Sequence, residues 1–347
     1  MSGIALIGGG LFIKNFHLPA LLENEANIVA VYSRSTKSAS SVVEEIEKHG
    51  SKQLASKVSV YSDEKKENLD ELLKRDDVQG VLVALPILVQ PDVVRKCLAA
   101  GKHVLCEKPI AKDFDEAKKL VEEYKSKYTN KGVIFSIAEQ LRYDRASIKA
   151  REMVQSGKIG KLQAVHGRVW NAMTTDTDWY KTEWRQNAQF QGGFVLDAGV
   201  HAIATMRYVS NAEILETASF TSQTKEFLKP IDTVNAALKF SNDIYGTFSI
   251  TFAAAKPWQE FVYSGSKGAL TVVLEGFGTY HLTLEDGQGN VIDRATIEGK
   301  ALYEENKAFL DAIQKGKNEK AASVEEAIAD LAVIESFCSG GGRVKTL

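Results

Sequence analysis

Three residues of this 347-residue chain have the types and spacing needed for proton transfer. Lys108 closely follows the apolar run His103–Cys106, and Asp197 and His201 lie four residues apart much later in the chain. An ammonium group stabilises negative charge that develops on an oxygen, and an imidazole can donate a proton near neutral pH. Positions four apart share one face of a helix, so a helical segment would let Asp197 orient His201. The pattern predicts a proton-transfer site.

The chain begins with a strand that runs directly into glycines. Ile4–Ile7 is apolar and is followed by Gly8-Gly9-Gly10-Leu11-Phe12-Ile13. In the dinucleotide-binding pattern the first glycine permits a tight turn and the second lets backbone amides approach a pyrophosphate at a helix N-terminus. Ile13 replaces the third glycine, which serves only helix–strand packing. We therefore expect a phosphate-bearing cofactor at this turn, contacted by Gly8, Gly10, Leu11 and Phe12.

The residues after the second apolar run, Ile28–Tyr32, bear on the type of nucleotide. NAD sites usually carry Asp or Glu about 20 residues beyond the glycines, where it binds the ribose 2′-hydroxyl. No acid is present there, and the chain continues with Ser33, Arg34, Ser35, Thr36 and Lys37. Arg34 can pair bidentately with a 2′-phosphate, to which the serines can donate. The sequence predicts NADP(H) in preference to NAD.

Length and composition indicate an ordinary two-domain globular protein. The hydrophobic fraction is 44%, the charged fraction 25% and the net charge −2, which gives no reason to expect nucleic acid or an anionic membrane as a partner. The three cysteines lack metal-ligand spacing and are expected to be reduced thiols, and no cluster predicts a metal site. With no signal peptide or spanning segment recognised, we expect a cytoplasmic protein.

Alternating strand and helix patterns predict the architecture. Residues 1–138 read as a doubly wound α/β dinucleotide-binding domain with a parallel sheet. Its strands are expected at Ile4–Ile7, Ile28–Tyr32, Val78–Ala84, His103–Cys106 and Val133–Ala138, and its helices at Ser38–His49, Asn68–Lys74, Pro91–Ala100 and Asp113–Lys127. Residues 139–347 read as an α/β domain for substrate binding and oligomerisation, with a large, mostly antiparallel open sheet. Its expected elements are a helix at Arg145–Ser156, apolar alternation at Lys161–Trp170, Glu216–Lys225, Thr233–Phe240, Ile244–Ala253, Glu260–Val273 and Thr279–Leu284, and a last helix at Val324–Cys338, which has the option of packing back on the first domain.

Several segments in this order resemble the Gfo/Idh/MocA family of oxidoreductases, named after glucose-fructose oxidoreductase, inositol dehydrogenase and a rhizopine catabolism protein. They are the glycine turn, residues 99–109 through Glu107-Lys108-Pro109, Trp184-Arg185, residues 192–201, Gly265-Ser266-Lys267-Gly268 and the closing helix. The chain is more similar to the eukaryotic branch than to the bacterial inositol dehydrogenases. The resemblance implies a homodimer or homotetramer formed through the C-terminal sheet.

The resemblance also implies roles for individual residues. Lys108 is expected near the nicotinamide and the reacting carbon–oxygen group, with Asp197 and His201 on the facing domain and a cis peptide before Pro109. Further contacts to the cofactor are expected from Leu85, Pro86, Gln90, Glu107, Trp184 and Arg185, of which Arg185 could instead reach substrate. Gln90 lies where the family commonly carries polar residues near the nicotinamide ribose, in a stretch that is otherwise apolar here.

Two questions stay open from the sequence alone. Tyr180 competes with His201 as the general acid, and we rank it second because an aromatic ring there is more often a stacking wall. The preferred function is hydride transfer between NADP(H) and a sugar, polyol, aldehyde or diol. A non-enzymatic NADP-sensing regulator of the same fold is the alternative, although Lys108 and His201 are both present. A related glycosidase-like redox enzyme is a third interpretation. It would need a tightly held NAD, and the missing acid after the second apolar run argues against it.

Overall fold

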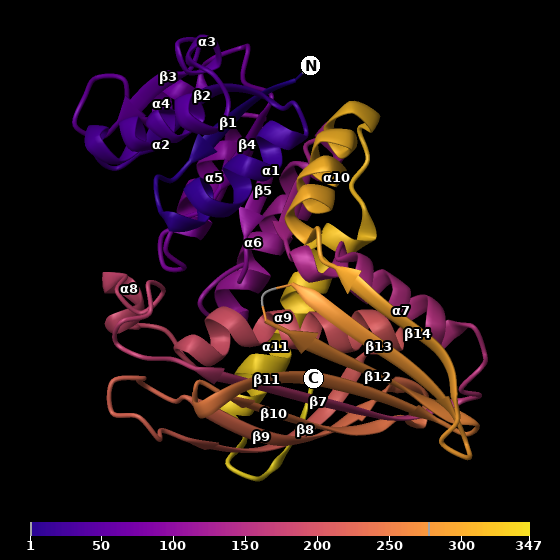
Figure 1. Ribbon diagram of the computed structural model, residues 1–347. Coiled ribbons are helices and arrows are strands. Elements are labelled where there is room, and N and C mark those ends of the chain that lie inside the picture. Colours follow the sequence, from indigo (N-terminus) through magenta and orange to yellow (C-terminus); the bar gives the residue numbers. More distant parts are fainter. Residues whose placement is uncertain (1, 277) are drawn as a thin grey trace. The chain divides into compact units, whose positions relative to one another are not determined.

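The computed structural model describes residues 2–276 and 278–347 (Figure 1). Contacts between residues divide the chain into two compact units. The first contains Met1–Gln140 and Leu302–Ile328, and the second contains Leu141–Ala301 and Ala329–Leu347. Residues 302–328 thus group with the first unit, although they lie beyond the expected boundary at residue 138. The functional division into a cofactor domain and a substrate domain stays a prediction.

The first unit is built on a parallel sheet, with the strand order β3-β2-β1-β4-β5-β6 in the described residues. The strands are β1 (Gly3–Ile7), β2 (Asn27–Ser33), β3 (Ser59–Ser62), β4 (Gly80–Val83), β5 (His103–Glu107) and β6 (Phe135–Ala138). The helices are η1 (Ile13–His17), α1 (Leu18–Glu23), α2 (Thr36–His49), α3 (Lys52–Ala55), α4 (Leu69–Leu73), α5 (Gln90–Ala99), α6 (Phe114–Lys127), η2 (Thr129–Lys131), α10 (Ala301–Lys315) and η5 (Lys320–Ala322). The short helix η3 (Gln140–Arg142) begins at the last residue of the first segment of this unit and continues into the second unit.

Burial on both faces explains why these strands are almost continuously apolar. Every residue of β1 and β4 is buried, as expected for a sheet covered by helices on both sides. On one side, Leu21 of α1, Val42 of α2 and Phe309 of α10 share a core cluster with strand residues. Local capping also follows the sequence, because Asp113 accepts a hydrogen bond from the Glu116 amide at 2.8 Å and thereby begins α6.

The second unit is a nine-stranded, mostly antiparallel sheet in the described residues, with the order β14-β13-β12-β11-β7-β10-β9-β8-β15. Only the β7–β10 neighbours among these pair in parallel. The strands are β7 (Leu162–Ala172), β8 (Ile214–Ser222), β9 (Thr233–Phe240), β10 (Tyr245–Thr251), β11 (Ala253–Gly265), β12 (Gly268–Glu275), β13 (Thr279–Asp286), β14 (Val291–Glu298) and β15 (Val344–Thr346). Helices α7 (Arg145–Gln155) and α9 (Phe194–Ser210) contact this sheet, α8 (Glu183–Gln186) and η4 (Ser241–Asp243) are short, and α11 (Val324–Gly340) ends in this unit (Figure 1).

The predicted fold class is confirmed, with local differences. The pattern over Glu260–Val273 was predicted as one alternating segment. It contains the end of β11, a turn and most of β12. Gly265 and Gly268 bound that turn, and an added Cβ would lie 2.2 Å and 2.1 Å from backbone oxygens of other segments. The edge strand β3 was not predicted.

Candidate active site

The sheet of the first unit brings three predicted segments to one edge. The parallel register pairs Ile7 with Val83 and Val83 with Cys106, so β1, β4 and β5 end side by side. Ligands of open parallel sheets bind outside the carboxyl ends of the strands, where the strand order reverses, as it does here between β1 and β4. The glycine turn, the half-buried Leu85 and Pro86, and the half-buried Lys108 follow those three ends.

The three glycines of the turn have different surroundings. Gly8 has φ +127°, and an added Cβ would lie 2.3 Å from the Ala84 carbonyl oxygen. An added Cβ on Gly9 would lie 2.3 Å from the Ser38 hydroxyl, whereas one on Gly10 would meet nothing within 4 Å. Gly8 and Gly9 are therefore required by the packing of the protein itself, and Gly10 leaves the backbone open to a ligand. This open approach fits a dinucleotide phosphate.

The apolar residues after the glycines are only partly covered. Leu11 and Phe12 are half-buried, and the Phe12 ring stacks on Phe16 with centroids 4.9 Å apart. Phe16 itself is 36% exposed. Leu11 and Phe12 therefore stay accessible to a ligand at the turn.

The end of β2 presents cations, but the structure adds a carboxyl group that sequence reasoning missed. Arg34 and Lys37 are exposed, Ser33 is buried, and the Ser35 hydroxyl accepts from the Ser38 amide at 3.2 Å as the cap of α2. Glu64 follows β3, and its Oε2 accepts from the Thr36 amide at 2.9 Å. An acid thus does lie beside this turn. The signal that could have identified Glu64 is the edge strand β3, which pairs with β2 and ends just before this residue.

Gln90 holds the backbone on both sides of Lys108. Its side chain is fully buried, and Nε2 donates to the carbonyl oxygens of Glu107 at 3.0 Å and Pro109 at 3.3 Å. Its Oε1 accepts from the Leu85 amide at 3.3 Å. The Lys108–Pro109 peptide is cis, as expected. This burial gives Gln90 a different role from the predicted ribose contact, because it ties the ends of β4 and β5 together.

A buried polar cluster surrounds Glu107. Glu107 Oε1 lies 2.7 Å from His17 Nε2, and both side chains are buried. Glu305 of α10 is also buried, and within the described residues neither of its carboxyl oxygens has a hydrogen-bond partner. Burial first, and then the charges of Glu107 and Glu139, hold the pKa of Glu305 well above its usual range. The Glu107 side chain contacts protein groups, where a cofactor contact was predicted.

Replacing Glu305 with glutamine is expected to stabilise the protein at alkaline pH. A raised pKa in the folded state contributes stability that is present below the unfolded pKa and is lost as pH rises through the folded pKa. The amide removes this loss, so the melting temperature of E305Q should exceed that of the wild type at about pH 8 and match it at about pH 4. Calorimetry at both pH values checks this, and an E305Q melting temperature below wild type at alkaline pH contradicts it.

In the second unit, the segment with Asp197 and His201 is helical. Both residues lie in α9, four apart, as the condition in the sequence argument required. Gly192 and Gly193 precede the helix with positive φ, and an added Cβ on Gly193 would lie 2.5 Å from the Lys229 carbonyl oxygen. Asp197 is 6% exposed and His201 is half-buried. The helix therefore presents both predicted groups from a rigid element.

Arg185 and Asp197, which were predicted separately, form one pair. Arg185 Nε donates to Asp197 Oδ2 at 2.7 Å, and both side chains are largely buried. The guanidinium also lies over the Trp184 ring at 4.0 Å and the Trp179 ring at 5.3 Å. Such stacking restricts the arginine to one orientation. Sequence reasoning missed this pair because the two residues lie on separate helices.

Tyr180 belongs to an aromatic group of the second unit. Its ring lies 6.4 Å from that of Phe194 and 5.1 Å from that of Phe227, centre to centre, and the residue is half-buried. Trp170 does not pack in the core: it is 36% exposed, with the Arg168 guanidinium 4.9 Å from its ring. Side chains alternate between the two faces of β7, and that of Trp170 lies on the face opposite to the buried Val169.

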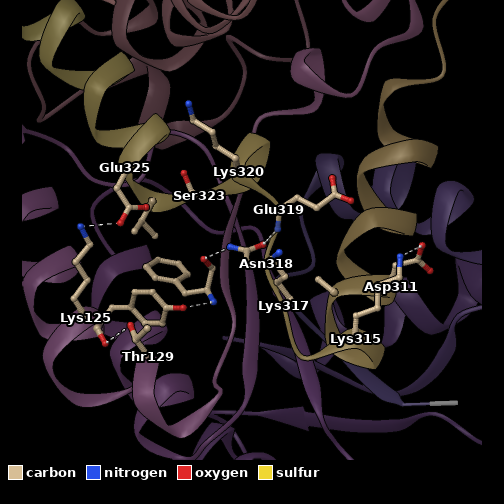
Figure 2. Close-up of a pocket in the computed structure, with 14 residues that line it drawn as sticks. Lys125, Thr129, Asp311, Lys315, Lys317, Asn318, Glu319, Lys320, Ser323 and Glu325 are labelled. Carbon is tan, nitrogen blue, oxygen red and sulfur yellow. Dashed lines mark hydrogen bonds and ion pairs between the residues drawn. The ribbon is translucent and has the colours of Figure 1, made fainter.

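A large cavity of the first unit lies away from the strand ends that precede the glycine turn and Lys108. A cavity of about 970 Å³ in the first unit is lined by residues of α6, η2, α10 and η5, by Phe135 at the start of β6, and by the first residues of α11 (Figure 2). It is therefore at the amino end of β6, opposite to the strand ends that follow the ligand rule. Figure 2 shows Lys125 paired with Glu325 and Lys315 paired with Asp311 at its rim. Strand topology, and not cavity size, thus marks the candidate site.

Within residues 2–276 and 278–347, no group of three or more His, Cys, Asp or Glu side chains could hold a metal ion. In the same residues no helix is long and apolar enough to cross a membrane. The three cysteines are free thiols, and Cys97 and Cys106 are buried.

Comparison with known proteins assigns both parts of the chain. Residues 2–135 match the model described as an oxidoreductase family with an NAD-binding Rossmann fold, and residues 147–271 match the GFO/IDH/MocA C-terminal domain. The chain is 34% identical to "Dehydrogenase FPY6" of Fusarium mangiferae, over 97% of this chain and 95% of that protein. It is 26% identical to the 1,5-anhydro-D-fructose reductase of Ensifer adhaerens, over 79% of this chain and 81% of that protein.

A solved structure agrees with these matches. The crystal structure of an oxidoreductase from Thermotoga maritima superposes with a TM-score of 0.85 at 27% identity, covering 99% of this chain and 98% of that one. Fold and sequence together define an oxidoreductase with a Rossmann domain that binds NAD or NADP. The chain belongs to the Gfo/Idh/MocA family.

Proposed function

We propose that this protein is an NADP(H)-dependent oxidoreductase that transfers a hydride between nicotinamide and a carbon–oxygen group of a sugar, polyol, aldehyde or diol. The observation that carries the proposal is the common edge of β1, β4 and β5, where the glycine turn, Leu85-Pro86 and Lys108 follow adjacent strand ends. When bound, the cofactor supplies or accepts the hydride. The protein's own residues stabilise the developing charge and transfer the proton.

Each candidate catalytic residue has a distinct task in this proposal. The Lys108 ammonium stabilises the charge that develops on the carbonyl oxygen, an interaction that is stronger in the transition state than in the ground state. His201 donates the proton that the substrate oxygen requires. Asp197 lies on the same helix and orients the imidazole of His201, while Arg185 holds the Asp197 carboxylate at 2.7 Å. Tyr180 stays the second candidate for the acid.

The substrate class is drawn from the chemistry of the candidate residues and from the relatives. A relative with 81% coverage is named for reduction of an anhydro sugar, which contains a carbonyl group beside hydroxyls. Trp179 and Trp184 offer flat aromatic faces in the second unit, and such faces suit the apolar face of a sugar ring. We therefore favour small polyhydroxylated carbonyl compounds among the proposed substrates.

Turnover measurements test the proposed function. Nicotinamide absorbance is followed against a panel of aldehydes, ketoses, aldoses and trans-diols, with NADPH and NADH in parallel. Turnover with NADPH supports an oxidoreductase. Binding of NADPH without turnover of any compound would favour the NADP-sensing regulator.

The choice of nucleotide depends on opposing charges at the end of β2. Arg34 and Lys37 are exposed cations, whereas the Glu64 carboxylate accepts a hydrogen bond from the Thr36 amide between them. R34A is expected to weaken NADPH binding about 10- to 100-fold and NADH binding little, because it removes a charge-assisted contact to the 2′-phosphate. E64Q is expected to strengthen NADPH binding relative to NADH binding, because it removes a negative charge near the 2′-phosphate. Calorimetric titration measures both, and equal weakening of the two nucleotides by R34A contradicts the assignment.

Two remaining expectations concern assembly and location. We propose a homodimer or homotetramer formed through the uncovered face of the nine-stranded sheet, where Trp170 is 36% exposed, and we propose a cytoplasmic location. No nucleic-acid or membrane partner is proposed, since the net charge is −2.

A further inference from the structure

A chain of buried polar side chains ends on the backbone of Lys108. It consists of Asn306 on α10, His17 at the end of η1 and Glu107 at the end of β5. Asn306 and His17 are 0% exposed and Glu107 is 7% exposed. Asn306 Nδ2 lies 3.3 Å from His17 Nδ1, His17 Nε2 lies 2.7 Å from Glu107 Oε1, and Glu107 Oε2 accepts from the Lys108 amide at 3.1 Å. The proposed mechanism assigns no task to His17 or Asn306.

The hydrogen-bond pattern assigns the protons of this chain. Asn306 Nδ2 also lies 2.8 Å from the Leu302 carbonyl oxygen, which can only accept, so this atom is the amide nitrogen. Its second hydrogen therefore points at His17 Nδ1, which must accept. The imidazole proton is then on Nε2 and is donated to Glu107 Oε1. Both carboxyl oxygens of Glu107 are occupied, one by His17 and the other by the Lys108 amide.

We propose that His17, Glu107 and Asn306 are positioning residues that fix the direction of Lys108 for hydride transfer, a proposal that rests on the catalytic role of Lys108. Gln90 holds the carbonyl oxygens of Glu107 and Pro109, so the residues around Lys108 are restrained from the backbone and from the Glu107 side chain. Hydrogen bonds in a buried chain are strengthened by the low local dielectric constant. Displacing a catalytic group by about 1 Å can cost about 100-fold in rate.

Glutamine at position 107 tests this proposal with almost no change of shape. If the amide nitrogen replaces Oε1, it faces the Nε2–H of His17, and if it replaces Oε2, it faces the Lys108 N–H. Either orientation places two donors together. We expect kcat of E107Q to fall about 10- to 100-fold, with the Kd for NADPH within about threefold of wild type.

A second substitution should restore the pairing. In the double variant H17Q/E107Q, the amide of Gln at position 17 can turn its oxygen toward the new amide nitrogen. The kcat of the double variant is expected to exceed that of E107Q about tenfold, a recovery that simple damage to the fold would not produce. Glu122→Gln is the matched control for loss of one carboxylate, because Glu122 is exposed on α6 in the same unit.

The outcomes separate this proposal from the proposed function. Wild type and Lys108→Met are measured in parallel, and turnover retained by Lys108→Met refutes the catalytic role of the lysine itself. With that role intact, unchanged kcat in E107Q overturns the positioning proposal. Joint loss of kcat, cofactor binding and melting temperature, without recovery in H17Q/E107Q, also overturns it and indicates a purely structural cluster.

A readout without turnover tests the proton assignment directly. In ¹⁵N-histidine-labelled protein, the ring signals of His17 are identified by their loss in H17Q. The proposal predicts a proton on Nε2 and none on Nδ1 in the wild type, with a changed pattern in E107Q. A proton on Nδ1 of wild-type His17 overturns the chain of donors, whether or not a substrate has been found.

Discussion

Replacing Lys108 with methionine is expected to reduce turnover about 1,000-fold while NADPH still binds with nearly unchanged affinity. Methionine keeps most of the side-chain volume but removes the ammonium group, so charge on the substrate oxygen loses its partner in the transition state. The glycine turn and the end of β2, which are the proposed binding elements for the rest of the cofactor, are unaffected. Single-turnover kinetics and fluorescence titration measure the two effects separately.

A nearby lysine provides the control for this experiment. Lys112 is about half exposed, with Asp113 as a distant partner at 3.9 Å, and lies four residues beyond Lys108. Lys112→Met should keep turnover within about twofold of wild type, because a screened surface pair contributes little. If Lys108→Met also kept its turnover, the catalytic assignment would be wrong.

The second large effect is on stability. Asp330→Asn is expected to lower the free energy of unfolding of the second unit by about 3–5 kcal/mol. Asp330 Oδ2 accepts from Arg142 at 2.6 Å and Oδ1 from Arg207 at 2.6 Å, and all three side chains are at most 4% exposed. Without the carboxylate, two buried guanidinium groups lose their shared counter-charge. Urea unfolding followed by circular dichroism measures the loss.

Asp293→Asn is the control in the same unit. Asp293 pairs with Lys158 at 3.6 Å, and both side chains are more than one-third exposed. Its loss should cost less than about 1 kcal/mol, because solvent screens the pair. Equal costs for Asp330→Asn and Asp293→Asn would show that the buried cluster does not hold the second unit together.

Local patterns predicted the fold where burial makes the sequence periodic or continuously apolar. The buried strands β1, β4 and β5 were found because helices cover both faces, and Asp113 marked the start of α6 as predicted. The edge strand β3 has no fully apolar run, and three of its four residues are only half-buried, so it gave no such signal. Helix α10 was missed although it is amphipathic, because no distinct end signal was recognised there.

The candidate site was predictable as a set of residue types but not as a set of contacts. Lys108, Asp197 and His201 were identified from chemistry and spacing, and α9 is helical as that argument required. The contacts of Glu107 with His17 and of Glu64 with Thr36 join residues far apart in the chain. Such pairs are set by strand order and helix packing, which the sequence pattern does not specify residue by residue.

Transfer of deuterium from labelled NADPH to a substrate tests the central claim most directly. The wild-type protein is incubated with the panel of carbonyl compounds and NADPH deuterated at the carbon that donates the hydride, and the products are analysed by mass spectrometry. We predict a product alcohol that contains one deuterium, at a rate lowered about 1,000-fold in Lys108→Met. NADPH that binds but gives no deuterated product with any compound would contradict an oxidoreductase acting on these carbonyl groups.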